Sequence, residues 1–150
     1  MKKILLTIAM FLFCSVSVFA GSFPDVAEDH PNYNAIEYLK EKGIINGYAD
    51  GTFGPANPVN RAEAVKMVTK AFGIPVDGTY EILFPDVKSD AWFFIYVMGA
   101  REAGIINGYL DGKFLPANTV SLAEDLKIIV VASKGTLPDA VSTDVFVDVP

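Results

Sequence analysis

Residues 43–63 read GIINGYADGTFGPANPVNRAE, and residues 104–124 read GIINGYLDGKFLPANTVSLAE. The two stretches lie 61 residues apart, and 15 of their 21 positions are identical. An internal repeat of this kind constrains the architecture of a chain before any finer prediction is made. We therefore interpret the chain as two copies of one structural unit.

Each copy has the features of a tight loop that leads into a helix. A short Ile-Ile run is followed by Asn-Gly-Tyr and by Asp-Gly, which favours a turn because glycine adopts positive φ freely and aspartate closes the turn with its side chain. The copies end in Asn60-Arg-Ala-Glu63 and Ser121-Leu-Ala-Glu124. Both endings are typical of a capping box, in which the N-cap acceptor is followed by glutamate at the third helical position.

The repeated residues resemble the S-layer homology (SLH) family. Its pattern is Phe-x-Asp-Val, an aromatic-led helix, Gly-Ile-Ile-x-Gly-Tyr-x-Asp-Gly-x-Phe-x-Pro, and a helix start of the Thr-Arg-Ala-Glu type. Here Phe-Pro-Asp-Val begins at residues 23 and 84, and a third opening, Phe-Val-Asp-Val, begins at residue 146. The resemblance implies SLH repeats at 21–76 and 82–135, and the start of a truncated third repeat at 144–150.

The expected fold is mainly α-helical, with a helix–loop–helix unit in each repeat. Hydrophobic spacing and glycine stop signals predict helices over residues 29–42, 61–72, 90–103 and 122–133. The second repeat is more apolar, and its two helices are apolar nearly all round, which predicts that they are buried centrally. The SLH resemblance implies a pseudo-threefold, three-pronged helical domain made of three repeats, with ligand grooves between neighbours. Because the third repeat is cut short, we expect either a segment of a longer protein or a domain completed by association.

The first twenty residues are typical of a secretion signal peptide. Two lysines precede an apolar run at residues 4–13, and Val18-Phe-Ala20 fits the cleavage site. A retained membrane anchor would need about 20 apolar residues, and serines interrupt this run. Lipidation of Cys14 is a further alternative, but a phenylalanine stands before it, where a lipid-attachment motif needs a small residue. We expect cleavage after Ala20, which leaves a secreted chain without cysteine and without a transmembrane span.

Composition argues against several classes of function. Beyond residue 20 the chain has ten basic residues against 18 acidic ones, a net charge of −8, and no basic cluster, so nucleic acid is not an expected partner. His30 is the single histidine, which excludes a histidine-based metal site or triad. The Asp-Gly turns lack the acidic ladder of a calcium loop. Since the acidic residues recur at turn and cap positions, we expect no enzyme activity, metal or cofactor in this segment.

Arg61 is the first candidate binding residue. It stands at the start of a helix, where a guanidinium and the free backbone N–H groups can hold an anion, and its fork matches a carboxylate. It could equally be solvated, or paired with Asp25 or Asp29. The SLH resemblance implies that it binds an acidic, often pyruvylated, cell-wall glycan. The second copy has Leu122 at this position, so the second groove lacks the same anion contact.

Three more residues are candidates for glycan binding. Trp92 stands at the family's aromatic position and would either stack on a sugar in the groove between the repeats or pack in the core. Asp25 and Asp86 recur in Phe-Pro-Asp-Val. They would either satisfy the backbone N–H groups of a turn or accept hydrogen bonds from sugar hydroxyls.

Two functions fit this sequence. The first is noncovalent anchoring of a secreted surface protein, by binding an acidic secondary cell-wall polysaccharide or a peptidoglycan-linked glycan. The second is a structural module that assembles with other SLH or S-layer subunits without reading a glycan. Leu122 in place of arginine, and Pro31 in place of the aromatic residue in the first repeat, weigh toward the second. Both functions place the chain at the cell surface or cell wall.

Overall fold

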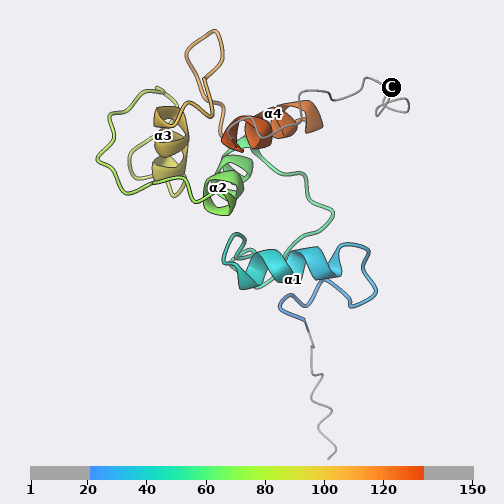
Figure 1. Ribbon diagram of the computed structural model, residues 1–150. Coiled ribbons are helices and arrows are strands. Elements are labelled where there is room, and N and C mark those ends of the chain that lie inside the picture. The colour runs from blue at the N-terminus through green and yellow to red at the C-terminus, as the bar shows by residue number, and fades with distance from the viewer. Residues whose placement is uncertain (1–20, 134–150) are drawn as a thin grey trace, which may run out of the picture.

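In the computed structural model, residues 21–133 are described. They form four helices, α1 (Tyr33–Glu41), α2 (Arg61–Ala71), α3 (Phe94–Glu102) and α4 (Leu122–Ala132), and within these residues no strand (Figure 1). The prediction of a mainly helical fold is confirmed. The predicted signal peptide and the predicted start of a third repeat lie outside the described residues. None of the four helices is both long enough and apolar enough to cross a membrane.

The starts of α2 and α4 are where the sequence predicts them. Asn60 accepts a hydrogen bond from the N–H of Glu63 at 2.9 Å, and the Glu63 carboxylate accepts one from the N–H of Asn60 at 3.0 Å. Ser121 and Glu124 form the same reciprocal pair at the start of α4. Each capping box satisfies donors that a helix leaves unpaired in its first turn, so the local sequence is sufficient to start these helices.

The starts of α1 and α3 fall four residues later than predicted, at Tyr33 and Phe94. Before α1 the chain is in successive turns, in which the N–H of His30 donates to Ala27 O and the N–H of Tyr33 donates to His30 O, both at 2.9 Å. Neither helix has a side-chain cap. Without a cap, turns compete with the first helical turn, and the predicted boundaries were wrong at this end.

The main core is built around α2, which packs against both α3 and α4. In Figure 1 these three helices lie together, while α1 lies apart from them. The core joins the apolar face of α2 to residues of the second repeat. Its buried members are Ala62, Val65, Val68, Phe84, Val87, Val97, Met98, Ala100, Ile105, Ile106, Phe114, Ile128 and Ala132. The second helix of the first sequence repeat therefore belongs to the core of the second.

A smaller cluster surrounds α1. It consists of Phe23, Val26, Ile36 and Ile45, and Met67 of α2 packs against it. Met67 thus links the small cluster to the helix that carries the main core.

The prediction that the second repeat is buried on all sides was wrong. Trp92 is 54% exposed, Leu126 is 41% exposed and Leu122 is 69% exposed. On α4 only Ile128 and Ala132 are buried. The reason is that, among the described helices, α4 is covered by α2 alone.

Candidate functional site

An aspartate holds the loop of each repeat in the same way. The Asp25 carboxylate accepts hydrogen bonds from the backbone N–H groups of Phe53 (2.8 Å) and Gly54 (2.7 Å). Asp86 accepts the corresponding bonds from Phe114 (2.9 Å) and Leu115 (2.7 Å). The bond from Phe53 is the main cause that lowers the pKa of Asp25. Both aspartates thus satisfy backbone N–H groups, one of the two roles that the sequence left open.

Each loop is closed over a pair of phenylalanine rings. Phe23 and Phe53 have ring centroids 5.4 Å apart, and Phe84 and Phe114 have centroids 5.7 Å apart, both in tilted contact. A Cβ atom at Gly108 would lie 2.6 Å from Cε1 of Phe84, closer than two carbon atoms can approach. The repeated Asn-Gly-Tyr therefore needs its glycine because an aromatic ring lies against the backbone.

The second loop receives the start of α2. The N–H of Arg61 donates to Asn118 O at 2.9 Å, and the N–H of Ala62 donates to Pro116 O at 3.1 Å. An antiparallel bridge between Asn60 and Thr119 continues this contact. Two backbone donors of the first helical turn, which have no partner inside the helix, are thus satisfied by the other repeat.

Arg61 is buried at this contact, with 9% of its surface exposed. Its guanidinium carbon lies 4.9 Å from the centroid of the Tyr109 ring and 5.1 Å from that of Phe114. Its ion-pair partner is Glu124, at 3.8 Å from Nη1 to Oε1, rather than Asp25 or Asp29. The Nε atom is buried and has no hydrogen-bond partner. Arg61 is therefore a buried cation held mainly by aromatic rings, with donor capacity left over.

Glu124 is fixed by several donors at once. Its carboxylate accepts hydrogen bonds from the hydroxyl of Tyr109 at 2.8 Å and from the N–H and hydroxyl of Ser121 at 3.0 and 2.8 Å. The bond from the Ser121 N–H contributes most and, with the bond from Tyr109, lowers the pKa of Glu124 to about 2. The same bond to Glu124 raises the pKa of Tyr109. Glu124 therefore stays ionised beside Arg61 at neutral pH.

Trp92 lies at a different place, on the wall of a groove of about 650 Å³. The groove is bounded by the first loop, including Tyr48, Phe53 and Asn57, and by Lys66 of α2. The Lys66 amine lies 5.3 Å from the centroid of the Trp92 ring. Since Trp92 is 54% exposed, it forms a groove wall, the second of the two positions that the sequence allowed.

The four predicted residues therefore divide between two places. Asp86 holds the loop that carries Phe114, beneath Arg61. Asp25 holds Phe53 and Gly54, which line the Trp92 groove. Arg61 does not line that groove. Arg61 and Trp92 thus contact opposite loops at the junction of the two repeats, and the structure does not bring them into one pocket.

A sequence model of the S-layer homology domain matches residues 22–65 and 83–124. These matches include both loops, both aspartates and the junction around Arg61. The chain belongs to the S-layer homology family.

Among its relatives are large surface proteins. The SLH chain is 36% identical over 119 residues to S-layer protein EA1 of Bacillus anthracis, covering 78% of this chain and 14% of that protein. It is also 36% identical over 119 residues to an S-layer protein of Bacillus licheniformis, covering 78% of this chain and 13% of the relative. An uncharacterized cell wall amidase of Bacillus anthracis is 30% identical over 131 residues, covering 85% of this chain and 24% of the relative. The chain thus spans a small part of each protein.

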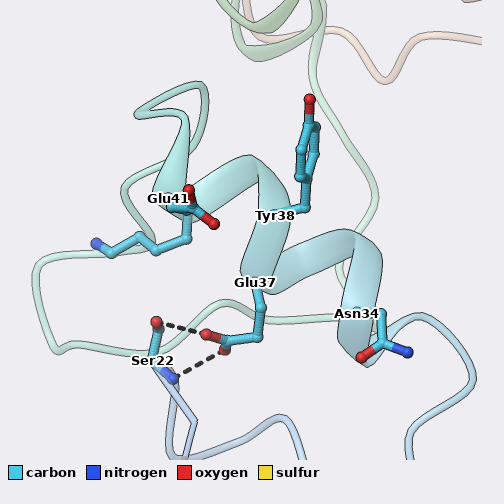
Figure 2. Close-up of a pocket in the computed structure, with 6 residues that line it drawn as sticks. Ser22, Asn34, Glu37, Tyr38 and Glu41 are labelled. Atoms are coloured by element: carbon cyan, nitrogen blue, oxygen red, sulfur yellow. Dashed lines mark hydrogen bonds between the residues drawn. The ribbon is translucent and has the colours of Figure 1, made fainter.

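A second hollow of this SLH chain lies beside α1 (Figure 2). There the N–H and hydroxyl of Ser22 donate to the two carboxylate oxygens of Glu37, at 2.8 and 2.7 Å. Tyr38 points away from this pair in Figure 2. This contact fastens the beginning of the described chain to α1, and none of the predicted site residues lies there.

Sequence reasoning missed the residues around Arg61, namely Tyr109, Phe114 and Glu124. Their signal was present, since the tyrosine, phenylalanine and glutamate recur at equivalent positions in both SLH repeats. What the sequence could not show is that residues of the second repeat contact the helix start of the first. Within residues 21–133, no group of three or more His, Cys, Asp or Glu side chains is placed to hold a metal ion.

Proposed function

We propose that this SLH segment anchors a secreted surface protein noncovalently to the cell wall by binding an acidic glycan, such as a pyruvylated secondary cell-wall polysaccharide or a glycan linked to peptidoglycan. Family membership and the S-layer relatives support a location at the cell surface or cell wall. The proposal concerns this segment alone and includes no catalytic step.

The observation that carries the proposal is the environment of Arg61. Its guanidinium is almost fully buried, its Nε has no hydrogen-bond partner, and its nearest carboxylate is 3.8 Å away. A buried donor without a partner is costly, and a ligand carboxylate would satisfy it by a charge-assisted bond. The start of α2 adds the partial positive charge of a helix N-terminus. An acidic sugar substituent has the charge and geometry that this position favours.

The other predicted residues have supporting roles in the proposal. The exposed ring of Trp92 offers a face on which a sugar can stack, and Lys66 beside it adds a cation suited to an acidic polymer. Asp25 and Asp86 keep the two loops in position, and each oxygen that bonds one N–H still has acceptor capacity for a sugar hydroxyl. A polymer that crosses the junction of the repeats would contact both places.

Pelleting of the purified chain with isolated cell-wall sacculi tests the proposal. Arg61→Leu should weaken binding roughly tenfold to a hundredfold, since a charge-assisted hydrogen bond contributes about 1.5–3 kcal/mol. Leucine is the informative replacement because the second repeat carries Leu122 at this position and because an apolar group can replace a buried ion pair without loss of stability. Arg101→Leu, at the only other arginine, makes the same change of charge and should leave binding intact.

Trp92→Ala provides an independent arm, with Tyr38→Ala as its control, since Tyr38 is 57% exposed but lies on α1 away from the groove. We expect only the tryptophan variant to lose binding. Sacculi from which the secondary polysaccharide has been stripped by acid should no longer retain the wild-type chain. Equal retention on intact and stripped sacculi, or equal binding by wild type and Arg61→Leu, would contradict glycan binding at Arg61.

The second candidate function is a self-assembling module of a surface layer that does not recognise a glycan. The exposed apolar side chains of α4, Leu122, Leu126 and Val131, favour it. Under this function the variants at Arg61 and Trp92 would behave like their controls in the sacculus assay, while the chain would still associate with other S-layer subunits.

A further inference from the structure

The contact between the start of α2 and the second loop, which we call the docking contact, has two sides. The helix side is Asn60, Arg61 and Ala62, and the loop side is Pro116 to Thr119 with the ring of Phe114. Because the chain is an internal repeat, each side has a copy elsewhere in the molecule. The equivalent loop side is residues 55–58, and the equivalent helix side is residues 121–123.

The copied loop side is open. Pro55 O and Asn57 O correspond to the two carbonyls that accept from α2, and within residues 21–133 neither accepts a hydrogen bond. The ring of Phe53 is only partly buried and lines the groove of about 650 Å³, whereas its equivalent, Phe114, is completely buried under Arg61. The first loop has thus the shape of a docking site, and no helix start from the described chain fills it.

The copied helix side is open as well. In the part of the chain that the structure describes, the backbone N–H groups of Leu122 and Ala123 have no hydrogen-bond partner. Leu122 is 69% exposed, although the equivalent residue, Arg61, is 9% exposed. Both halves of an interface that the molecule already uses once are therefore present a second time and unused.

We propose that a second copy of this chain completes the contact, with the start of α4 of one copy docked in the first-loop groove of the next. The N–H groups of Leu122 and Ala123 would donate to Asn57 O and Pro55 O of the second copy, as Arg61 and Ala62 do to the second loop. The Leu122 side chain would lie against the rings of Tyr48 and Phe53. This contact is heterologous, so it generates closed rings or open chains rather than a twofold dimer.

The position of Leu122 sets the strength of the contact. In the docking contact inside the chain, the guanidinium of Arg61 lies on two rings and near Glu124. The groove has the corresponding rings and Glu63, but leucine supplies only apolar contact. The intermolecular contact is therefore weaker than the internal one, and an arginine at position 122 should strengthen it. This inference is independent of glycan binding.

Sedimentation of the exported chain over a range of micromolar concentrations tests the proposal. The wild type should associate reversibly. Leu122→Arg should strengthen association about tenfold, since a desolvated cation–π contact contributes about 1–2 kcal/mol. Tyr48→Ser, in the groove, should weaken association, whereas Tyr38→Ser, the same change on α1, should not. A monomeric wild type whose Leu122→Arg variant is also monomeric, or equal effects of the two tyrosine variants, would overturn the proposal.

A cysteine pair tests the geometry directly. The bridge between Asn60 and Thr119 corresponds to Ser121 of one copy opposite Pro58 of the next. Directly paired residues of an antiparallel bridge are close enough for a disulfide. With Cys14 absent, a mixture of Pro58→Cys chains and Ser121→Cys chains should form a mixed disulfide dimer on mild oxidation. A mixture of Pro58→Cys and Tyr38→Cys chains should not. Equal cross-linking in both mixtures would overturn the proposed orientation.

Discussion

Arg61 and Leu122 occupy equivalent positions in the two repeats, yet their surroundings differ. Both follow a capping box residue at the start of a helix, and the local sequence around them is nearly the same. Arg61 is buried between two rings of the other repeat, while Leu122 is exposed. The difference comes from what lies opposite each helix start. A residue's role in a repeat protein therefore depends on its neighbour in space as well as on its motif.

Glu124 gives the junction a predicted dependence on acid. Its pKa falls from an unfolded value near 4.5 to about 2 in the folded chain. A carboxyl group with a lowered folded pKa stabilises the fold above its unfolded pKa, and this contribution is lost as the pH falls through the folded value. We expect the melting temperature to decrease between about pH 4.5 and pH 2, and Glu124→Gln to show a smaller decrease over this interval.

The control for this prediction is Glu102→Gln, at the exposed end of α3. This variant should retain the acid dependence of the wild type. Thermal melts followed by circular dichroism at closely spaced pH values would measure all three curves. Parallel curves for wild type and Glu124→Gln would show that Glu124 does not couple ionisation to folding.

At the residue scale, the sequence predicted what is local and missed what is distant. Arg61 at a helix start and the turn-holding role of Asp25 and Asp86 could be inferred from their immediate neighbours. The partner of Arg61 could not, because Glu124 is 63 residues away and each nearby aspartate was an equally good candidate on paper. The burial of Arg61 also revises its expected behaviour, since truncation to alanine would leave a cavity beside Tyr109 and Phe114.

The loop of each repeat is an element in its own right, held by one aspartate. Asp86→Ala would leave the N–H groups of Phe114 and Leu115 without partners in a partly buried position, at a cost of about 1–3 kcal/mol. The bonds of Asp25 are exposed, so water can replace them and Asp25→Ala should cost less. Urea denaturation of the two variants measures the difference. A larger loss for Asp25→Ala would contradict the burial argument.

α4 offers a test of which helix face is buried. Ile128 is 4% exposed and belongs to the main core, so Ile128→Ala should lower the free energy of unfolding by about 2–5 kcal/mol. Leu122 is 69% exposed, so Leu122→Ala should change it by less than about 0.5 kcal/mol, in contrast to a core leucine. Equilibrium denaturation of both variants decides. Comparable losses would mean that Leu122 is covered in solution, for instance by a second copy.

The helices differ in how well the sequence places them. α2 and α4 begin as predicted because their capping boxes act within one turn. α1 and α3 lack a side-chain cap, and their starts depend on turns that the predicted periodicity does not reveal. The buried face of α4 was also predicted poorly, since apolar residues occur on several sides and only packing against α2 selects Ile128 and Ala132.

At the scale of the whole molecule, the packing units do not coincide with the sequence repeats. α2 follows α1 in the first repeat, but its residues Val65 and Val68 lie in the core of the second. α1 packs with its own loop in a smaller cluster, which Met67 connects to α2. The repeat boundary seen in the sequence, between residues 76 and 82, therefore falls inside a cooperative unit.

This arrangement predicts how damage spreads through the fold. Val65 is fully buried between the repeats, so Val65→Ala should cost about 2 kcal/mol and should reduce amide protection in α3, which belongs to the other repeat. Ile36→Ala, in the small cluster, should reduce protection in α1 and leave α3 nearly unchanged. Native-state hydrogen exchange resolves the two patterns, because it reports opening free energies segment by segment. If the unit were the sequence repeat, Val65→Ala would instead weaken α1 and α2 together and spare α3. That result would contradict a core shared across the repeat boundary.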